Sequence, residues 1–421
     1  MRDTTTIGIL GGYGAVGSAV ARRLHQSTAA SLLIAGRDLG RAEELVRSLD
    51  TGSALAEPVA VDLADPAALD RFAARCGLLV NCAGPSYRVL DTVARAALHN
   101  GTDYVDAAGD DPTFLRLSSG GGAHEWLAAG RIALLSAGAL PGLSGLLPRH
   151  LANIAGQATR LDAYLGGVAP LTPAAAGDVL LSRGPEHGTP GASWRDGTVR
   201  ERSLVPRRGL SLAAFPRPVD AFPFLSTEAV RLVRALRLSQ VNWYTAFGGD
   251  RLPEQLALSW ALRDTNTSDL VSAAAEDVRR HGTWYGQEFH LWNGDDAEAP
   301  AAVLSLTCDD SYELSGFLAA AATNAVLAGE IPEGVHFAAN VLKPTKIFQA
   351  LSVDPAAKIS IDEPAVQLGA VSGLDQIPAA ELVIEDGHRP STDAAVQRGE
   401  LELATEPHAA VPDVDDRQVG R

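Results

Sequence analysis

The chain contains few cysteines for its length: Cys76, Cys82 and Cys308 are the only three among 421 residues. Three isolated cysteines build no disulfide framework, which indicates a reducing compartment. Neither they nor the ten histidines occur at the close spacings of a zinc site, so no metal site is predicted.

Long apolar runs and an excess of positive charge are also missing. No apolar run reaches the roughly 18 residues that a membrane-spanning helix needs. Met1-Arg2-Asp3 leads directly into the first expected strand, which predicts no secretory signal peptide and a cytoplasmic location. The formal net charge of −16 argues against nucleic acid and anionic membranes as partners, because both attract basic surfaces.

Two common catalytic signatures are absent. No Gly-x-Ser-x-Gly elbow occurs, which argues against a Ser/His/Asp hydrolase. No Tyr-x-x-x-Lys pair occurs either, which argues against the short-chain dehydrogenase route to alcohol oxidation. What remains is a chain with 46% hydrophobic and 20% charged residues, an ordinary globular composition, and long enough for two domains.

A glycine-rich turn follows the first expected strand. Gly12, Gly14 and Gly17 form a Gly-x-Gly-x-x-Gly pattern between an apolar run and an amphipathic helix. The first glycine permits a tight turn, the second lets the backbone approach a pyrophosphate, and the third lets helix and strand pack closely. The helix directs its free N–H groups and its positive dipole end at the phosphates. We therefore predict a dinucleotide site that also includes Tyr13, Ala15 and Val16.

The end of the second expected strand, residues 31–35, indicates which dinucleotide binds. An NAD site usually carries an acidic residue there, but this strand leads into Arg37 and Asp38. Arg37 offers a planar guanidinium suited to a phosphate, and Arg41 lies one helical turn further on. The alternative is that Arg37 is a solvated loop residue. Asp38 is interpreted as a helix cap, so the sequence predicts NADP(H) rather than NAD.

The third expected strand, residues 57–63, includes Asp62 and Leu63. The Asp62 carboxylate is suited to accept hydrogen bonds from an adenine amino group; equally, it is suited to cap the helix expected at 67–75. After the fourth expected strand, residues 78–82, three small residues leave room for a cofactor: Ala83, Gly84 and Pro85.

Two more strands are expected at 104–106 and 131–135, so the first 150 residues alternate strands and helices as a doubly wound parallel sheet does. In such a sheet, ligands bind outside the carboxyl ends of the strands. We therefore expect one edge, called the rim below, to face the nicotinamide. The rim comprises residues 84–87, 106–110 and 138–144.

Four motifs occur in order along this part of the chain: Gly11 to Gly17, Asn81 to Pro85, Gly101 to Asp106 and Pro141 to Ser144. Together they resemble the saccharopine dehydrogenase-like reductases, and the stretch from Val303 to Leu351 is similar to that family as well. The resemblance implies an NADP(H)-binding Rossmann domain and a mixed-sheet second domain over the active site. The middle of the chain matches poorly, so the resemblance bears on cofactor and reaction class rather than on substrate.

Hydride transfer is performed by the nicotinamide, whereas reduction of an imine or a polarised C=C bond also needs a proton donor near the rim. Tyr87 is one candidate, with packing or cofactor contact as the alternative. Asp106 and Asp110 are the others. Asp110 and Asp111 could repel each other and so raise a pKa, or form a solvated loop or a helix cap before Pro112.

Beyond residue 150 the pattern changes to extended runs and hairpins interrupted by helices. Asp196-Gly197 is a favourable two-residue hairpin turn, and a second hairpin is expected to join 287–292 to 302–306. A mixed or antiparallel sheet with helices on one face follows. The Gly-, Pro- and Arg-rich residues 183–223 are interpreted as a lid or as an irregular loop.

The predicted fold is therefore α/β: an N-terminal Rossmann domain with a doubly wound parallel sheet, and a second α+β domain. The tail from Val353 onward has fourteen acidic and five basic side chains and no aromatic residue, so it is expected to be largely mobile. The expected divisions are 1–150 for the Rossmann domain, 151–335 for the substrate and dimerisation domain, 336–352 for a helix returning to the Rossmann domain, and 353–421 for the tail.

These observations predict an NADP(H)-dependent, biosynthetic reductase of a C=N or conjugated C=C bond in a small or carrier-bound metabolite. A homodimer is expected because two-fold homo-oligomers predominate. A redox-neutral cyclase or a sensor that keeps the NADP site is the alternative, because no proton donor is obvious. Five aromatic residues suit a partly apolar substrate, although each is a core candidate: Trp243, Tyr244, Trp284, Tyr285 and Trp292.

Saccharopine formation itself is a third option. It requires arginines that bind substrate carboxylates, and four in the second domain are candidates: Arg200, Arg202, Arg207 and Arg208. The lone histidines His281 and His290 are expected to be structural.

Overall fold

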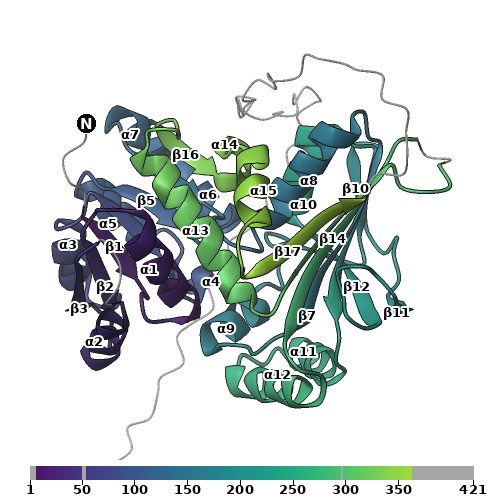
Figure 1. Cartoon of the computed structure of the whole chain (residues 1–421), viewed down its shortest axis with the longest axis horizontal. Helices are drawn as coiled ribbons and strands as arrows, with labels where there is room; N and C mark the ends of the chain where they lie inside the picture. The colour runs from purple at the N-terminus through teal and green to yellow at the C-terminus, as the bar shows by residue number, and fades with distance from the viewer. Residues whose placement is uncertain (1–5, 50–53, 295–296, 363–421) are drawn as a thin grey trace, which may run out of the picture. The chain divides into compact units, whose positions relative to one another are not determined.

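Two β-sheets and the helices packed on them make up the part of the computed structural model that is described, residues 6–49, 54–294 and 297–362 (Figure 1). In the first sheet, seven strands run parallel to their neighbours. In spatial order they are β16 (Gly334–Phe337), β6 (Ile132–Leu135), β5 (Asp103–Asp106), β4 (Leu78–Asn81), β1 (Ile7–Leu10), β2 (Leu32–Gly36) and β3 (Ala56–Ala60). Strands β1, β4, β5 and β6 are buried along their whole length, as strands covered on both faces should be. The expected Rossmann sheet is confirmed.

Helices follow the strands of this sheet. They are α1 (Ala15–Ser27), α2 (Leu39–Ser48), α3 (Pro66–Ala73), α4 (Ser86–Val89), α5 (Thr92–His99), α6 (Asp111–Ser118) and α7 (Gly122–Ala128), with a 3-10 turn at Ser119–Gly121. Helix α1 buries Val20, Ala21 and Leu24, the apolar stripe expected of a helix packed on a sheet. The local sequence thus places an amphipathic helix directly behind the glycine-rich turn.

The seventh strand of the first sheet comes from a distant part of the chain. Strand β16 pairs in parallel with β6, and the register places Phe337 beside Leu135. The sequence assigned this region partly to the second domain and partly to a returning helix. The strand forms because Phe337 is buried against the Rossmann core, a contact that the sequence around it does not reveal. Helices α14 (Ala338–Val341) and α15 (Pro344–Ser352) follow it.

The second sheet is mixed, as expected. Strand β13 runs parallel to β7, whereas β14 and β15 are antiparallel to their neighbours. The strands of this sheet are β7 (Arg160–Val168), β8 (Gly188–Pro190), β9 (Ser193–Arg195), β10 (Thr198–Arg200), β11 (Arg207–Leu210), β12 (Val219–Ser226), β13 (Gln240–Phe247), β14 (Trp284–Trp292), β15 (Ala302–Cys308) and β17 (Ala357–Asp362). The accompanying helices are α8 (Leu143–Ala155), α9 (Pro173–Leu181), α10 (Thr227–Leu236), α11 (Arg251–Leu262), α12 (Thr267–His281) and α13 (Ser311–Leu327).

Both predicted hairpins are present. In the β9–β10 hairpin, Asp196 has φ 46° and Gly197 has φ 82°, the left-handed pair that a two-residue turn of matching twist requires. In contrast, residues 183–223 are not an irregular loop. They contribute β8 to β11 and the start of β12. Strands β8 and β11 pair with β12, β9 and β12 pair with β13, and β10 pairs with β9, which satisfies their backbone groups.

The segment that the sequence assigned to the tail begins with a strand. Strand β17 pairs antiparallel with β15, with Ile359 opposite Leu306 and Ile361 opposite Leu304. Alternating isoleucines therefore extend the second sheet at the start of the segment that the sequence assigned to the acidic tail. Residues 363–421, on which the rest of the tail expectation falls, lie outside the described residues.

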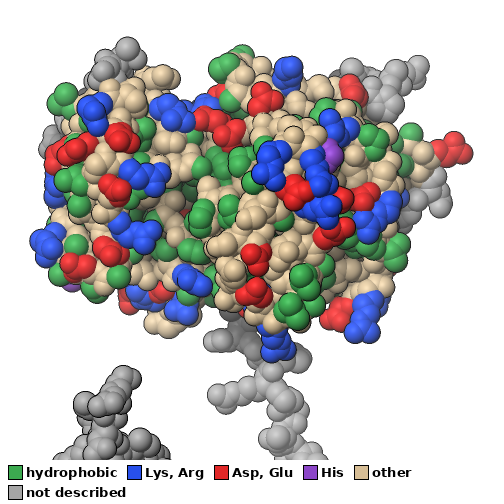
Figure 2. All heavy atoms as spheres, turned by 90° about the horizontal axis from the view of Figure 1, so that it is seen from below, with side chains coloured by type: hydrophobic (Ala, Val, Ile, Leu, Met, Phe, Trp, Pro, Cys, Tyr) green, Lys and Arg blue, Asp and Glu red, His purple; other side chains and the backbone are tan. Residues whose placement is uncertain are grey.

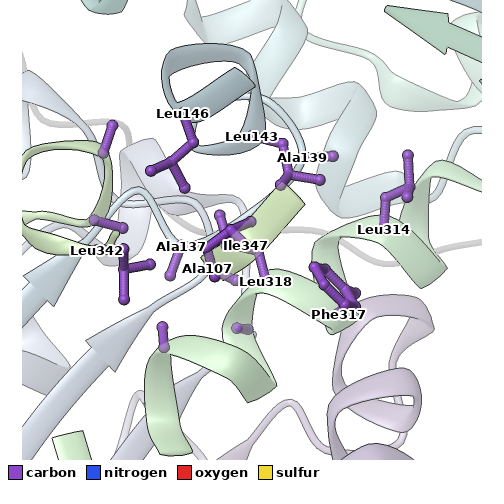
Figure 3. Close-up of a cluster of buried hydrophobic side chains, with 14 of the residues drawn as sticks. Ala107, Ala137, Ala139, Leu143, Leu146, Leu314, Phe317, Leu318, Leu342 and Ile347 are labelled. Atoms are coloured by element: carbon purple, nitrogen blue, oxygen red, sulfur yellow. The ribbon is translucent and has the colours of Figure 1, made fainter. Parts of the chain in front are cut away.

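One apolar core joins the rim to helices α8 and α13. Figure 3 shows Leu143 and Leu146 of α8 on one side of this cluster and Leu314, Phe317 and Leu318 of α13 on the other. Small side chains lie between them: Ala107 and Ala139 of the rim, and Ala137 directly before it. Because interiors of this kind are close-packed, the backbone of the rim is held rigidly from behind.

Helix α13 also braces the helix behind the glycine-rich turn. A Cβ added at Gly316 would lie 2.4 Å from that of Ala19, so only glycine lets α13 and α1 approach this closely. An ion pair of Arg22 with Glu313, at 2.5 Å, flanks the contact. The dinucleotide helix is thus packed between its own sheet and a helix that leads out of the second sheet.

No helix within the described ranges has the length and apolarity to cross a membrane. On the face drawn in Figure 2, acidic and basic side chains alternate instead of separating into patches of one sign. An ion-pair network of Asp250, Arg251, Glu276 and Arg280 joins the start of α11 to α12.

Candidate active site

The glycine-rich turn has the geometry that a pyrophosphate site needs. A Cβ added at Gly17 would lie 2.2 Å from the Gly11 carbonyl oxygen, so this position must be glycine for α1 to pack against the turn. A Cβ at Gly14 would meet the same oxygen at 3.0 Å and open space elsewhere. Helix α1 begins after Gly14 with no capping side chain and no acidic residue in its first turn. Its first N–H groups, at Ala15 and Val16, lack partners within the helix and are free to bind an anion.

Tyr13 organises the end of β2. Its hydroxyl accepts a hydrogen bond from the Asp38 backbone N–H at 2.8 Å, and its ring covers Gly36, where a side chain would collide with it. The Arg41 guanidinium lies over the same ring, 4.7 Å from its centroid. Asp38 caps α2 through the Arg41 N–H, as the sequence predicts. The Arg37 side chain is exposed and engages no described residue in a hydrogen bond or ion pair, so it is available to a phosphate.

The Asp62 carboxylate is exposed just beyond β3 and accepts a hydrogen bond from Ala64 N–H at 3.0 Å. The cap of α3 is Asp65, which accepts from Ala67 and Ala68, so the alternative that Asp62 caps this helix is wrong. The sequence contains a reason for the difference, because Asp65 stands directly before Pro66 and proline favours the first helical position.

The loop after β4 is covered by α9. Ala83 N–H donates to the Asn81 side chain at 3.1 Å, which shapes the turn into Gly84 and Pro85. A Cβ at Gly177 of α9 would lie 2.6 Å from Pro85 Cγ, so the helix packs directly on the loop, and α4 and α9 lie side by side (Figure 1). From the sequence, we interpret these small residues as leaving room for a cofactor. They also let α9 pack closely on the loop.

Asp178 on α9 anchors the start of α4. Its carboxylate accepts hydrogen bonds from the Ser86 hydroxyl at 3.0 Å and from the Tyr87 N–H at 3.1 Å. Burial raises the pKa of the Asp178 carboxyl, and these two hydrogen bonds act in the opposite direction. Asp178 was not a sequence candidate. Its signal is that of a lone acid in an apolar helix, the segment PAAAGDVLL.

Tyr87 is the one candidate proton donor with a free polar group. Its hydroxyl has no hydrogen-bond partner within the described part of the chain and is not sealed from solvent. Burial raises the pKa of the phenol, and the carboxylates of Asp110 and Asp178 raise it further. The phenol therefore stays protonated at neutral pH and can donate. The ring of His187 lies against it, with centroids 4.0 Å apart.

Asp106 lies apart from this group, inside the sheet edge. One carboxylate oxygen accepts from the Ala108 and Gly109 N–H groups, at 2.9 and 2.7 Å, and the other from the side chains of Asn81 and Tyr104. With four donors and 2% exposure, the carboxylate has no access to a substrate. It shapes the turn after β5.

Asp110 is tied to the second sheet by α10. Arg231 donates to Asp110 at 2.9 Å and also pairs with Asp111, and the Thr227 hydroxyl contacts Asp110 at 3.4 Å. The Arg231 guanidinium lies 3.7 Å from the centroid of the Phe337 ring. The two acids begin α6 and share a buried cation, so they are neither a solvated loop nor an isolated repelling pair.

The buried carboxylate of α10, Glu228, also holds the rim. Glu228 accepts hydrogen bonds from Gly142 N–H, at 2.8 Å, and from the Ser144 hydroxyl. Burial raises its pKa to about 7, against the effect of these hydrogen bonds. Glycine at position 145 makes room for it, because a Cβ there would lie 2.9 Å from the carboxylate. No local sequence pattern distinguishes this glutamate from an ordinary helix-start acid.

The other candidates of the second domain lie away from the rim. Arg207 donates to the Tyr164 hydroxyl at 2.7 Å and covers the Tyr244 ring, and Arg208 pairs with Asp220. His290 pairs with Glu288, and His281 contacts Arg217.

Among the described residues, no cluster of His, Cys, Asp and Glu is placed to hold a metal ion. The five aromatic candidates are mostly buried in packing: Trp243, Tyr244, Trp284, Tyr285 and Trp292.

Comparison with known proteins adds to this geometry. Residues 7–123 match the family described as "Saccharopine dehydrogenase NADP binding domain". No curated protein matches the chain. Among solved structures, apo saccharopine dehydrogenase (L-Glu forming) from Saccharomyces cerevisiae is similar over 86% of this chain and 100% of its own, with 14% identity and a TM-score of 0.57. A myo-inositol dehydrogenase from Corynebacterium glutamicum covers the same shares at 12% identity and a TM-score of 0.40. At such identities, the structural likeness of the yeast protein establishes a common fold.

Proposed function

We propose that the chain is an NADP(H)-dependent oxidoreductase that reduces a C=N or a conjugated C=C bond. The match of residues 7–123 to the saccharopine dehydrogenase NADP-binding domain family supports the cofactor and the reaction class. The substrate is a small or carrier-bound metabolite of a biosynthetic route. The predicted cytoplasmic location and homodimer belong to this proposal and rest on composition and on the prevalence of two-fold oligomers.

The observation that carries the proposal is the Tyr87 hydroxyl. It is a protonated donor without a partner among the described residues, on the short helix that leaves the Gly84-Pro85 turn. Reduction of either bond type adds a hydride at one atom and a proton at the other. A fixed neutral donor at the rim supplies the second component.

The described residues fit NADP(H). The open space at Gly14 and the uncapped start of α1 suit the pyrophosphate. Arg37 and Arg41 are assigned to the 2′-phosphate, where a guanidinium fork binds best. The remaining contacts are assigned to the adenine side, Asp62 and Leu63, and to the nicotinamide side, Ala83, Gly84 and Pro85. When bound, the cofactor supplies the hydride.

In this proposal the three candidate acids have different roles. Tyr87 donates its phenolic proton to the imine nitrogen or to the enoyl carbon as the hydride reaches the neighbouring carbon. Asp106 shapes the rim through its four hydrogen bonds. Asp110, paired with Arg231, joins α10 to the start of α6. Both aspartates are thus positioning residues.

A cofactor titration followed by a substrate panel tests the proposal. We expect NADPH to bind more tightly than NADH by fluorescence, and NADPH absorbance to fall when a suitable imine or enoyl compound is added. Tyr87→Phe should keep NADPH binding and lose most of the turnover. Tight NADPH binding with product formation but no cofactor consumption would contradict the reductase and support the redox-neutral cyclase.

A further inference from the structure

Tyr87 and His187 come from different sheets of the protein. Tyr87 stands on α4, at the end of a strand of the first sheet, and His187 precedes β8 of the second. Their ring centroids are 4.0 Å apart and the ring planes are inclined by 47°. His187 is only 8% exposed, so its side chain is buried next to the phenol.

The backbone of His187 is held on both sides. Its N–H donates to the Gly184 carbonyl at 3.1 Å, and its own carbonyl accepts from the Thr227 N–H at 3.3 Å. The imidazole Nε2 lies 3.4 Å from a Glu186 carboxylate oxygen, while Nδ1 is buried without a partner among the described residues. The ring therefore has a fixed place beside the phenol.

Tyr87, in contrast, stands on a short element. Helix α4 has four residues and no side-chain cap. Asp178 holds the Tyr87 backbone N–H, and His187 covers the ring. The first contact fixes the backbone of Tyr87, and the second restricts the side-chain torsions that decide where the hydroxyl points.

We propose that His187 is a positioning residue for Tyr87, whose imidazole packs against the phenol ring and fixes the direction in which the hydroxyl donates its proton. This role rests on the proposed function, because His187 would orient the free Tyr87 hydroxyl toward the substrate. Residue 187 thus acts through Tyr87 and need not touch the substrate.

The contact between His187 and Tyr87 is one of packing and not of proton exchange. The two rings are in tilted contact, and no hydrogen bond joins the hydroxyl to either imidazole nitrogen. Burial lowers the pKa of His187, and the carboxylates of Glu186, Asp110 and Asp178 act in the opposite direction. Arg231 of α10 also faces Tyr87. A neutral imidazole packs against the phenol as well as another aromatic ring does.

Two substitutions separate packing from proton exchange. His187→Ala removes the ring and is expected to lower kcat roughly 10- to 100-fold, the size of effect that misplacing a reacting group by about 1 Å produces, while the KM for NADPH stays unchanged. His187→Phe keeps a ring that cannot titrate, so it should retain most of the wild-type kcat and the same pH profile. If His187→Phe is as impaired as His187→Ala while both unfold like the wild type, the packing role is overturned.

A spectroscopic measurement makes the test independent of any substrate. The chain has seven tyrosines, so the ring resonances of Tyr87 in ring-labelled protein can be assigned by their loss in Tyr87→Phe. They should shift in His187→Ala and move much less in His187→Phe, because an aromatic neighbour remains. Identical Tyr87 resonances in the wild type and His187→Ala would overturn the proposal. His281→Ala, on the far end of α12, is the matched control and should change neither kcat nor these resonances.

Failure of the proposed function would look different. If Tyr87→Phe retained the wild-type kcat, Tyr87 would not be the proton donor, and the role of His187 in aiming a donor would be overturned with it. If Tyr87→Phe lost turnover but His187→Ala kept it, the reductase proposal would stand and the positioning role alone would be overturned.

Discussion

The Asp178 carboxylate accepts a hydrogen bond from the Ser86 hydroxyl at 3.0 Å, and this contact joins a helix of the second domain to the first residue of α4. The same oxygen accepts the Tyr87 N–H at 3.1 Å. The proposed proton donor therefore depends on the second domain for its backbone position as well as for the ring that covers it.

This relationship leads to a first prediction. Asp178→Ala leaves both donors unpaired in a largely buried site, so the free energy of unfolding should fall by about 1–3 kcal/mol and kcat should fall with it. Asp178→Asn keeps an oxygen that accepts both hydrogen bonds and should retain more of each. Denaturant unfolding and steady-state kinetics of the two variants check this. Equal losses in both variants would mean that the carboxylate charge, not its hydrogen bonds, is required.

The buried Glu228 predicts a pH dependence of stability. Its pKa of about 7 in the folded protein lies above the usual 4.5, so folding favours the protonated carboxyl. The resulting stabilisation is fully present below pH 4.5 and is lost as the pH rises through 7, by on the order of 3 kcal/mol. Glu228→Gln should flatten the curve of unfolding free energy against pH over this range, whereas the exposed Glu254→Gln should leave it unchanged. A curve of equal slope in Glu228→Gln would contradict the assignment.

Substitutions of Gly17 and Gly14, two glycines of the turn, should have different effects. Gly17→Ala places a Cβ 2.2 Å from a backbone oxygen, which must move α1, so we expect a loss of roughly 1–3 kcal/mol of stability. Gly14→Ala fills space that we assign to the pyrophosphate and should weaken NADPH binding with a smaller effect on stability. Thermal unfolding without ligand and NADPH titration separate the two. A Gly14→Ala protein that binds NADPH normally would place the pyrophosphate elsewhere.

Arg37 and Arg41 should decide the choice of cofactor. A hydrogen bond to a charged group contributes about 1.5–3 kcal/mol, so Arg37→Ala should raise the Kd for NADPH roughly 10- to 100-fold and leave that for NADH unchanged. Arg41→Ala should act in the same direction and also loosen Tyr13, whose ring it covers. The matched control is Arg47→Ala, at the other end of α2, which should change neither Kd. An equal loss of NADH binding in Arg37→Ala would indicate a contact outside the 2′-phosphate.

Local patterns account for the elements that we propose to bind the cofactor. The glycine spacing, the absence of an acid at the end of β2 and the alternation of strands and helices all act within a few residues of one another, so they are readable in the sequence. The Asp196-Gly197 hairpin is another such case, because the turn requires positive φ at both positions. The cap of α3 could also be predicted from the sequence, because Asp65 directly precedes a proline.

Tertiary packing alone determined the surroundings of Tyr87, the proposed proton donor. Asp178, His187, Glu228 and Arg231 reach the rim from α9, from the loop before β8 and from α10, and nothing in their own neighbourhoods marks them for that place. Their positions depend on how the second sheet, α8 and α13 pack against the Rossmann sheet. The sequence by itself thus determined the cofactor and the parallel sheet, because these follow from short-range backbone geometry and charge. Which carboxylates are buried, and which hydroxyl is left free, follow from long-range contacts that only the folded chain makes.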